Sequence, residues 1–597
     1  MTYTNENYRE RQKETKDKIV YSNEETKSNE KKELKREEET EQTEPIEKYI
    51  GKFKKIKDIN LKYIKSKYKI ASEVKETWID RYDQTALFLN PNIEVQDEGK
   101  QLGTYQKKDN KIFNTIGVNA ANGFVSRIIQ MLCPPQSNFI KIECGDAFKY
   151  YKKEEVDKIN LKLEEYSDIL NSIKNTSNFD MVISSFFSDL VLGTACLLVQ
   201  AGNEDNPLIF QNISFKDYAI TEGYQDFIDG VFRKFTVSIE AVKTQWRDID
   251  EASLKRLLNE INYKEDEKEK QIELNFIECT FYDYENNNYN YVVYEESKDV
   301  ILVSRVYDYN PFIILRWKKS GGDWYGRGVG MEALNDLKTF NKIQEYSLRA
   351  LSFTLPIILT DRDDVFKKNI SLKPGAINPV RWEQGKPIIQ TLNMSNGFDI
   401  QQFHLDQIKM DVNRTMMNSL IPDETRVRTA TEIEQRISEE YVNYTSVFGR
   451  LISEFIYKLP LVMLYTLQKA FDIFNDFEIK KLNSYHYRLK ITTPLNKQLN
   501  QNEIQNTIQT IQILSNLDPS GGLLQKFLKF DDMILNLIDK LGAPKKYIKT
   551  ADEIMEFEMR QQEAAAQQQQ MAMMQQQAEI QQKTAAAQQE QEQEYNY

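Results

Sequence analysis

Histidine, cysteine and net positive charge are all scarce in this sequence, and each shortage excludes a class of protein. The 597 residues include 2 histidines and 4 cysteines, and no two cysteines form a C-x-x-C pair. These counts argue against a His-rich or H-E-x-x-H metal site and against a disulfide framework. A formal net charge of −12 argues against a surface that grips nucleic acid everywhere. We therefore expect free thiols and neither a metal nor a cofactor.

The motifs of the common phosphate-binding and hydrolytic enzymes are also missing. No G-x-x-x-x-G-K-[ST] loop and no G-x-S-x-G elbow occurs. The glycines Gly326, Gly328 and Gly330 are spaced G-x-G-x-G, and we interpret them as a tight strand-to-helix turn that needs positive φ. The acidic residues at 361–364 lack the remaining ligands of a calcium loop, which favours a solvated loop. We expect no catalytic residue, so function must depend on shape, assembly and the placement of charge.

Long apolar runs are scarce, and one candidate for a membrane span occurs at 181–199, MVISSFFSDLVLGTACLLV. Its length suits a bilayer. Asp189 lies in the middle of it, however, and a carboxylate there would cost about 2.5–3.5 kcal/mol in hydrocarbon. We therefore expect a buried helix that runs into a strand, and no contact with a membrane. The N-terminal residues are charged and lack the apolar core of a signal peptide.

Hydrophobic periodicity is plentiful and predicts an α+β fold that is mainly helical. Residues 1–60 are an exception, because they have too few apolar side chains to offset the entropy of ordering, and we expect a flexible charged arm. Helical spacing dominates 111–200. Runs rich in β-branched and aromatic residues predict strands at 207–237 and 271–317, with a polar connection at 248–270 between them.

Two predicted helices flank a compact segment in the second half of the chain. Apolar residues recur every three or four positions at 331–355 and at 403–420, which predicts helices of roughly 20–25 residues, about 30–37 Å long. Turns between short extended runs at 359–402 predict a small α/β excursion. We expect the two helices to lie antiparallel as a stalk with the excursion at its tip. One apolar stripe on each helix suits packing between subunits of a ring, with the polar faces around an opening.

A third, longer helix is predicted from 430 to 462. Thr429 is a suitable N-cap and Glu432 its capping-box partner, while Pro460 predicts a kink near the far end. A short strand at 487–492 and further helices follow. The Gln-rich tail at 557–597 has almost no branched apolar residues, so it is either disordered or a helix that orders only within an oligomer.

The glycine-rich turn and the helix after it carry a family resemblance. Residues 321–356, GGDWYGRGVGMEALNDLKTFNKIQEYSLRALSFTLP, resemble the head-to-tail connector (portal) proteins of short-tailed bacteriophages. The shared turn corresponds to Tyr325, Gly326, Arg327 and Gly328, and the helix contains an L-x-D-L-x-x-x-N run that ends at Asn341. Further segments resemble the family in the same order, so the resemblance covers about residues 61–597; these segments are 118–143, 188–199, 230–246 and 428–440.

The resemblance implies a portal fold with a wing, a two-helix stem, a small α/β clip and a helical crown with a C-terminal barrel. The divisions that it implies for this sequence are a flexible arm at 1–60, the wing at 61–325, the first stem helix at 326–358, the clip at 359–402, the second stem helix at 403–421, a tunnel loop at 422–429, a long wing helix and strand at 430–495, the crown at 496–556 and a tail or barrel helix at 557–597.

The resemblance also implies a function and a set of partners. Twelve copies would form a ring at one capsid vertex, made in the host cytoplasm, through which the genome is packaged and ejected. The implied partners are double-stranded DNA without sequence preference, the terminase motor, then a tail adaptor, and the major capsid and scaffolding proteins. The alternatives are another ring or scaffold protein of the virion without a DNA-gating role, and a DNA translocase enzyme. The missing phosphate loop and the scarce histidine disfavour the enzyme.

The tunnel loop is the first candidate for contact with DNA. Its residues are Asp423, Glu424, Thr425, Arg426, Val427 and Arg428. Repeated around a ring, Arg426 and Arg428 would form a basic collar that touches phosphates and reads no sequence. Alternatively, these arginines pair with acidic residues of the same loop or with Glu432, on the same or a neighbouring subunit.

The stem helices are the second candidate. Lys338, Lys342 and Arg349 share one face of the first helix, and Lys409 and Asn413 lie on the polar face of the second. These side chains would either line the bore or form salt bridges between subunits.

Overall fold

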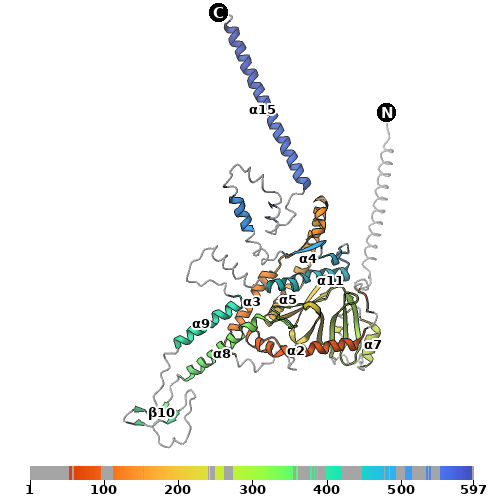
Figure 1. The fold of residues 1–597 in the computed structure, drawn as a ribbon, viewed down its shortest axis with the longest axis vertical. Helices are drawn as coiled ribbons and strands as arrows, with labels where there is room; N and C mark the ends of the chain where they lie inside the picture. Colours follow the sequence, from red (N-terminus) through yellow and green to blue (C-terminus); the bar gives the residue numbers. More distant parts are fainter. Residues whose placement is uncertain are drawn as a thin grey trace, which may run out of the picture.

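The protein is described by a computed structural model, which shows a body of two antiparallel sheets with helices packed around them (Figure 1). The described residues are 53–56, 59–95, 112–151, 153–238, 241–242, 246, 249–260, 273–353, 358–360, 377–379, 382–383, 386–387, 398–418, 447–475, 477–482, 485–491, 504–513, 516, 533–534, 537–538 and 551–594. Helix and strand both contribute, with helix in excess, so the predicted α+β class is confirmed.

The larger sheet has five strands in the order β4-β5-β6-β7-β8, and each strand is antiparallel to its neighbours. The strands are β4 (Tyr218–Glu222), β5 (Ile228–Ser238), β6 (Glu273–Asp283), β7 (Asn288–Glu295) and β8 (Ile301–Tyr307). They fall within the two regions where aromatic and β-branched runs predict strands. The connection between β5 and β6 differs from the prediction, because it contains a helix, α7 (Glu251–Glu260), which buries Leu257.

The smaller sheet contains the segment that was a membrane candidate. Its strands are β2 (Thr194–Ala201), β3 (Leu208–Ile213) and β9 (Phe312–Arg316), with β2 in the centre. The helix α5 (Phe179–Leu190) runs directly into β2, as predicted, and both are largely buried. Among the described residues, no helix is both long and apolar enough to cross a membrane.

Three further helices cover the sheets. They are α2 (Leu61–Leu89), α3 (Ile116–Leu132) and α4 (Lys153–Thr176). The strand β1 (Ile140–Cys144) pairs antiparallel with β14 (Tyr487–Ile491), although 343 residues separate Cys144 from its partner Tyr487. The helix α4 packs on β1, where the Ser167 hydroxyl accepts a hydrogen bond from the Ile142 amide at 2.9 Å. The predicted strand near 487 is therefore confirmed as part of the body.

The two helices predicted to form a stalk lie side by side. They are α8 (Val329–Phe353) and α9 (Phe398–Thr415), and Figure 1 shows both leaving the body in the same direction. Short strands lie at the far end, where β10 (Ile358–Thr360) pairs with β11 (Ile377–Pro379) and β12 (Trp382–Glu383) pairs with β13 (Lys386–Pro387). The helix α9 begins five residues before the predicted start at 403.

The long helix is described from residue 447 onward and contains a π-helical turn. This turn spans Ile452–Ile456, and the Tyr457 amide donates to the Ile452 carbonyl at 2.9 Å. The regular helix α11 (Lys458–Phe471) follows and includes Pro460 in its first turn. The irregular turn therefore lies about one turn before the proline, which has no amide to donate back to that turn, and the kink at Pro460 stays a prediction. The predicted cap at Thr429 lies outside the described residues.

The predicted N-terminal arm ends earlier than residue 60. Phe53 packs on Tyr307 with their ring centroids 4.8 Å apart, and Lys54 bridges to Val306 at the edge of the larger sheet. At the other end, the Gln-rich tail lies in the helix α15 (Ala551–Glu594), and its ordering within an oligomer stays a prediction. All four cysteines have free thiols, as predicted.

The buried carboxyl of Asp189 generates a prediction about pH. Burial raises the pKa of Asp189 from 3.8 to about 7, although a hydrogen bond from Asn212 at 2.8 Å opposes the shift. Between pH 3.8 and about pH 7, the folded chain holds a proton on Asp189 that the unfolded chain has released. The free energy of unfolding therefore falls as the pH rises through this range. The natural protein should lose about 2 kcal/mol of unfolding free energy when the pH rises from 5.5 to 8. Asp189→Asn should not show this loss, because asparagine has no proton to release.

Urea denaturation at the two pH values measures this difference. Asp205 lies in an exposed turn, and Asp205→Asn is the matched control that should leave the pH dependence unchanged. Parallel pH profiles for Asp189→Asn and the natural protein would contradict the assignment.

Candidate functional site

The turn from β9 into α8 is packed directly against the turn from α5 into β2, with backbone on backbone. A Cβ atom on Gly326 would lie 2.3 Å from the Gly193 carbonyl oxygen, and one on Gly328 would lie 2.1 Å from the Val191 carbonyl oxygen. Gly193 itself has a φ of +142°. The prediction of positive φ at Gly326, Gly328 and Gly330 is therefore wrong, since none of them has it. Gly326 and Gly328 need glycine because a second backbone occupies the space of a side chain, whereas a Cβ on Gly330 would lie 2.3 Å from the Leu89 side chain.

Hydrogen bonds hold the two peptide groups that flank the Gly326 Cα atom. The Gly326 amide donates to the Thr194 hydroxyl at 2.7 Å, and the Gly326 carbonyl accepts from the Tyr82 hydroxyl at 2.6 Å. The oxygens of Tyr82 and Thr194 are also 3.0 Å apart, so the three groups form one buried network. Because Tyr82 belongs to α2 and Thr194 to β2, the turn is joined to a helix and to the smaller sheet. We call this contact, formed by Tyr82, Gly193, Thr194, Gly326 and Gly328, the interlock.

Tyr325 joins the same turn to the larger sheet. Its side chain is fully buried, its hydroxyl accepts from the Ile220 amide of β4 at 3.1 Å, and its ring lies 5.4 Å from the ring of Phe215. Burial raises the pKa of the Tyr325 hydroxyl well above its ordinary value. The group is therefore neutral and serves as a hydrogen-bonding anchor. The neighbouring Arg327 points outward and donates to the Asp323 carboxylate at 2.8 Å.

A buried ion pair ties the long helix to the strand before the turn. The Arg316 guanidinium lies between Glu222, at 2.9 Å, and Glu454, at 2.7 Å. Glu454 belongs to the π-helical turn, and its second carboxylate oxygen accepts from the Arg316 amide at 2.9 Å. Sequence reasoning missed Arg316 and Glu454. The signal in the sequence was the position of Glu454 next to the apolar stripe of the helix. A carboxylate there is buried, and only a buried cationic partner offsets its cost of desolvation.

Two asparagines fix the base of the helix pair. The Asn341 side chain of α8 accepts from the Phe113 amide at 2.8 Å, and the Asn418 side chain, just after α9, donates to the Ala120 carbonyl of α3 at 2.7 Å. Asn341 ends the L-x-D-L-x-x-x-N run, so that motif has a structural role here. Both helices are thereby held to the region around α3.

The predicted stem residues of α8 have partners within the chain. Lys338 donates to Gln84 of α2 at 2.8 Å. Lys342 pairs with Glu345 at 2.8 Å, and Arg349 pairs with the same carboxylate. The hydrogen bond from Lys342 lowers the pKa of Glu345. On α9, Lys409 is exposed and Asn413 is half-buried.

The six predicted tunnel-loop residues, 423–428, lie outside the described residues, so their role stays a prediction. Within the part of the chain that is described, no group of three or more His, Cys, Asp and Glu residues could hold a metal ion.

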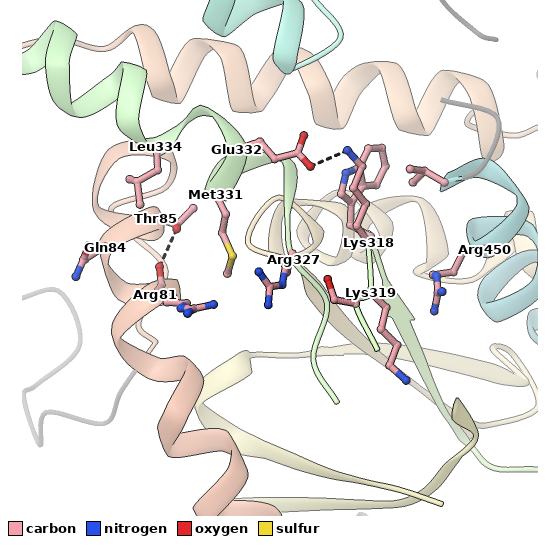
Figure 2. Close-up of a pocket in the computed structure, with 13 residues that line it drawn as sticks. Arg81, Gln84, Thr85, Lys318, Lys319, Arg327, Met331, Glu332, Leu334 and Arg450 are labelled. Carbon is pink, nitrogen blue, oxygen red and sulfur yellow. Dashed lines mark hydrogen bonds and ion pairs between the residues drawn. The ribbon is translucent and has the colours of Figure 1, made fainter. Parts of the chain in front are cut away.

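A pocket of about 710 Å³ opens beside the interlock (Figure 2). It lies between α2, the residues that follow β9, the first turns of α8 and the long helix. Its lining is basic, with five cationic residues and one acidic residue, Glu332; the cations are Arg81, Lys318, Lys319, Arg327 and Arg450.

The sequence is similar to proteins of known families. Residues 61–548 match the family described as "Bacteriophage head to tail connecting protein". The chain is 21% identical over 410 residues to the "Probable portal protein" of Bordetella phage BPP-1, and the match covers 64% of this chain and 70% of that protein.

Solved structures give weaker matches. The virion of a native gene transfer agent particle matches with a TM-score of 0.32 at 10% identity, over 71% of this chain and 89% of that one. The neck of a native particle of the same kind, computed with C12 symmetry, matches with a TM-score of 0.31 at 11% identity, over 72% and 90%.

The interlock generates a second prediction. Gly328→Ala places a Cβ against the Val191 carbonyl, so backbone must move, and we expect a loss of about 3 kcal/mol or more in the free energy of unfolding. The control is Gly321→Ala, because a Cβ at Gly321 meets nothing within 4 Å. Denaturation of both variants measures the effect. Equal stabilities would show that the close approach does not constrain residue 328.

Proposed function

Because the chain belongs to the family of bacteriophage head to tail connecting proteins, we propose that it is the portal subunit of a short-tailed phage. Twelve copies form a ring at one capsid vertex, and the genome enters and leaves through the ring. Members of the family are structural components of the virion and not enzymes. The curated relative carries the name "Probable portal protein", which supports this more specific role.

The observation that carries the proposal is the helix pair α8 and α9. The two helices contact each other, leave the body together and have the short strands β10–β13 at their far end. An isolated pair of this kind leaves apolar side chains uncovered, including Tyr346 at 55% exposure, Leu348 at 45% and Met410 at 61%. Packing against the pairs of neighbouring subunits would bury them. Circular repetition of a two-helix stem then encloses a channel.

The charge on α8 suits a channel through which DNA slides. Glu345 pairs with both Lys342 and Arg349, so two cations of the predicted stem face are already partly neutralised within the chain. Together with the net charge of −12, this leaves little attraction for phosphate along the helix. Contact with DNA is then local, at the tunnel loop, where Arg426 and Arg428 of each subunit form a collar.

The tip of the helix pair is the docking site for other proteins in this proposal. The terminase motor binds the clip during packaging, and a tail adaptor binds it afterwards. The major capsid protein and the scaffolding protein contact the wing. A ring protein without a DNA-gating role is the alternative, and the collar experiment below separates the two.

Ring formation is tested by electron microscopy of the purified full chain. We expect rings with a central hole, and we expect Leu348→Glu with Met410→Glu to prevent their formation by placing charges between packed helices. Met181→Glu is the control, because Met181 is 80% exposed and lies on α5, away from the helix pair. A natural protein that stays strictly monomeric would contradict the proposal.

The collar is tested by Arg426→Ala with Arg428→Ala. Rings should assemble normally, while the length of packaged DNA or its retention should fall, because the phosphate contacts are lost. The matched control is Lys255→Ala with Arg256→Ala, which removes two cations from the exposed side of α7. Packaging that equals the control would remove the collar and favour the alternative without DNA gating.

A further inference from the structure

We propose that the basic pocket beside the interlock binds the acidic run 37–47 of this chain's own N-terminal arm. The run has the sequence EEETEQTEPIE, with six glutamates and no lysine or arginine. This inference does not depend on DNA passing through the ring. It assigns a partner to a surface that the proposed function leaves unused.

Two guanidinium groups meet in the pocket around one indole ring. The Cζ atoms of Arg81 and Arg327 both lie 5.8 Å from the ring centroid of Trp78. Figure 2 shows the two side chains reaching toward each other across the hollow beside Met331. Two cations at one ring repel each other, and an anion between them would relieve the repulsion.

The charges around the pocket do not balance within the described residues. Lys318 pairs with Glu332 at 2.6 Å, and Arg327 pairs with Asp323 at 2.8 Å. Arg450 lies 3.3 Å from Glu454, but that carboxylate also holds Arg316.

Lys319 is held by Glu222 and Asp226, and Glu222 is again shared with Arg316. Among the described residues, no carboxylate forms an ion pair with Arg81. A carboxylate from elsewhere is therefore the missing partner.

The shape of the pocket favours a peptide over a DNA duplex. A volume of about 710 Å³ takes a few side chains, and the lining includes the apolar residues Met331, Leu334 and Val447. The run 37–47 offers Pro45 and Ile46 between glutamates, so it supplies both carboxylates and an apolar group. A duplex needs an open basic surface, and the carboxylate of Glu332 on the lining would repel its backbone.

The length of the chain between this run and the body sets how far the run can reach. The first described residue, Phe53, packs on the body against Tyr307 and Tyr465. A chain of six residues, from 47 to 53, reaches about 20 Å, and one of sixteen, from 37 to 53, reaches about 55 Å. A short tether gives an effective concentration in the millimolar range, which lets weak ion pairs suffice. The reach allows binding to the same subunit or to a neighbour.

Cysteine cross-linking in the full chain tests the proposal. Gln42→Cys places a thiol in the run and Gln84→Cys places one at the pocket, without changing any charge, in a background with Cys144→Ser. After mild oxidation, we expect a disulfide in low salt. Monomers with an internal disulfide indicate binding to the same subunit, and dimers indicate a neighbour. The control pairs Gln42→Cys with Lys255→Cys on α7.

The cross-link must depend on charge. Arg81→Gln with Arg327→Gln should lower its yield at least about fivefold, and Glu41→Lys with Glu44→Lys should lower it similarly. Thermal melting checks that each variant is folded, and the second pair leaves the pocket untouched. A yield no greater than the control, or one that survives both charge changes, would overturn the proposal. So would binding of a short duplex that needs Arg81 and Arg327 while the cross-link stays at the control level.

Discussion

The contact between the backbones at Gly193 and Gly326 determines where the rest of the molecule can lie. Gly326 sits in the turn that connects a strand of the smaller sheet to α8, so the position of this turn sets the position from which α8 leaves the body. The approach is too close for any side chain on either residue. The hydrogen bonds from Tyr82 and to Thr194 then fix the orientation of the two peptide groups on either side of the Gly326 Cα atom. The close backbone contact and the hydrogen bonds together allow one arrangement of the two turns.

Polar contacts, rather than apolar packing alone, fix the base of the helix pair. Arg316 connects the strand before the turn to the π-helical turn through Glu454, while Asn341 and Asn418 hold α8 and the end of α9 near α3. Buried polar groups are costly unless every partner is in place, so such contacts penalise alternative arrangements more than apolar contacts do. The π-helical turn fits this role, because it places Glu454 opposite Arg316. The exposed sides of α8 and α9 then remain available for other subunits.

Local patterns in the sequence predicted the elements but not the contacts between them. The stripes at 331–355 and 403–420, the helix running into a strand at 181–199 and the strand near 487 depend on spacing within a few residues, and the structure contains each of them. The interlock joins residues more than a hundred positions apart, so periodicity does not reveal it. The glycines of the turn were recognised, but the prediction attributed them to backbone conformation rather than to a neighbouring backbone. The helix α7 was missed because it is only ten residues long and lies between charged stretches, with Leu257 as its buried residue.

In the proposed ring, the helix pair has to be attached firmly to the body while it holds DNA weakly. The contacts that fix α8 use neutral groups, namely hydroxyls, amides and glycine backbone, or charges that are paired in the interior. The cations on its outer turns share Glu345. Firm anchoring therefore adds no exposed positive charge to the helix pair. A cluster of basic residues lies near the base of the helix pair, around Arg81 and Arg327, where the volume of the pocket suits a peptide. Separating strong attachment from exposed charge in this way lets one chain satisfy both demands.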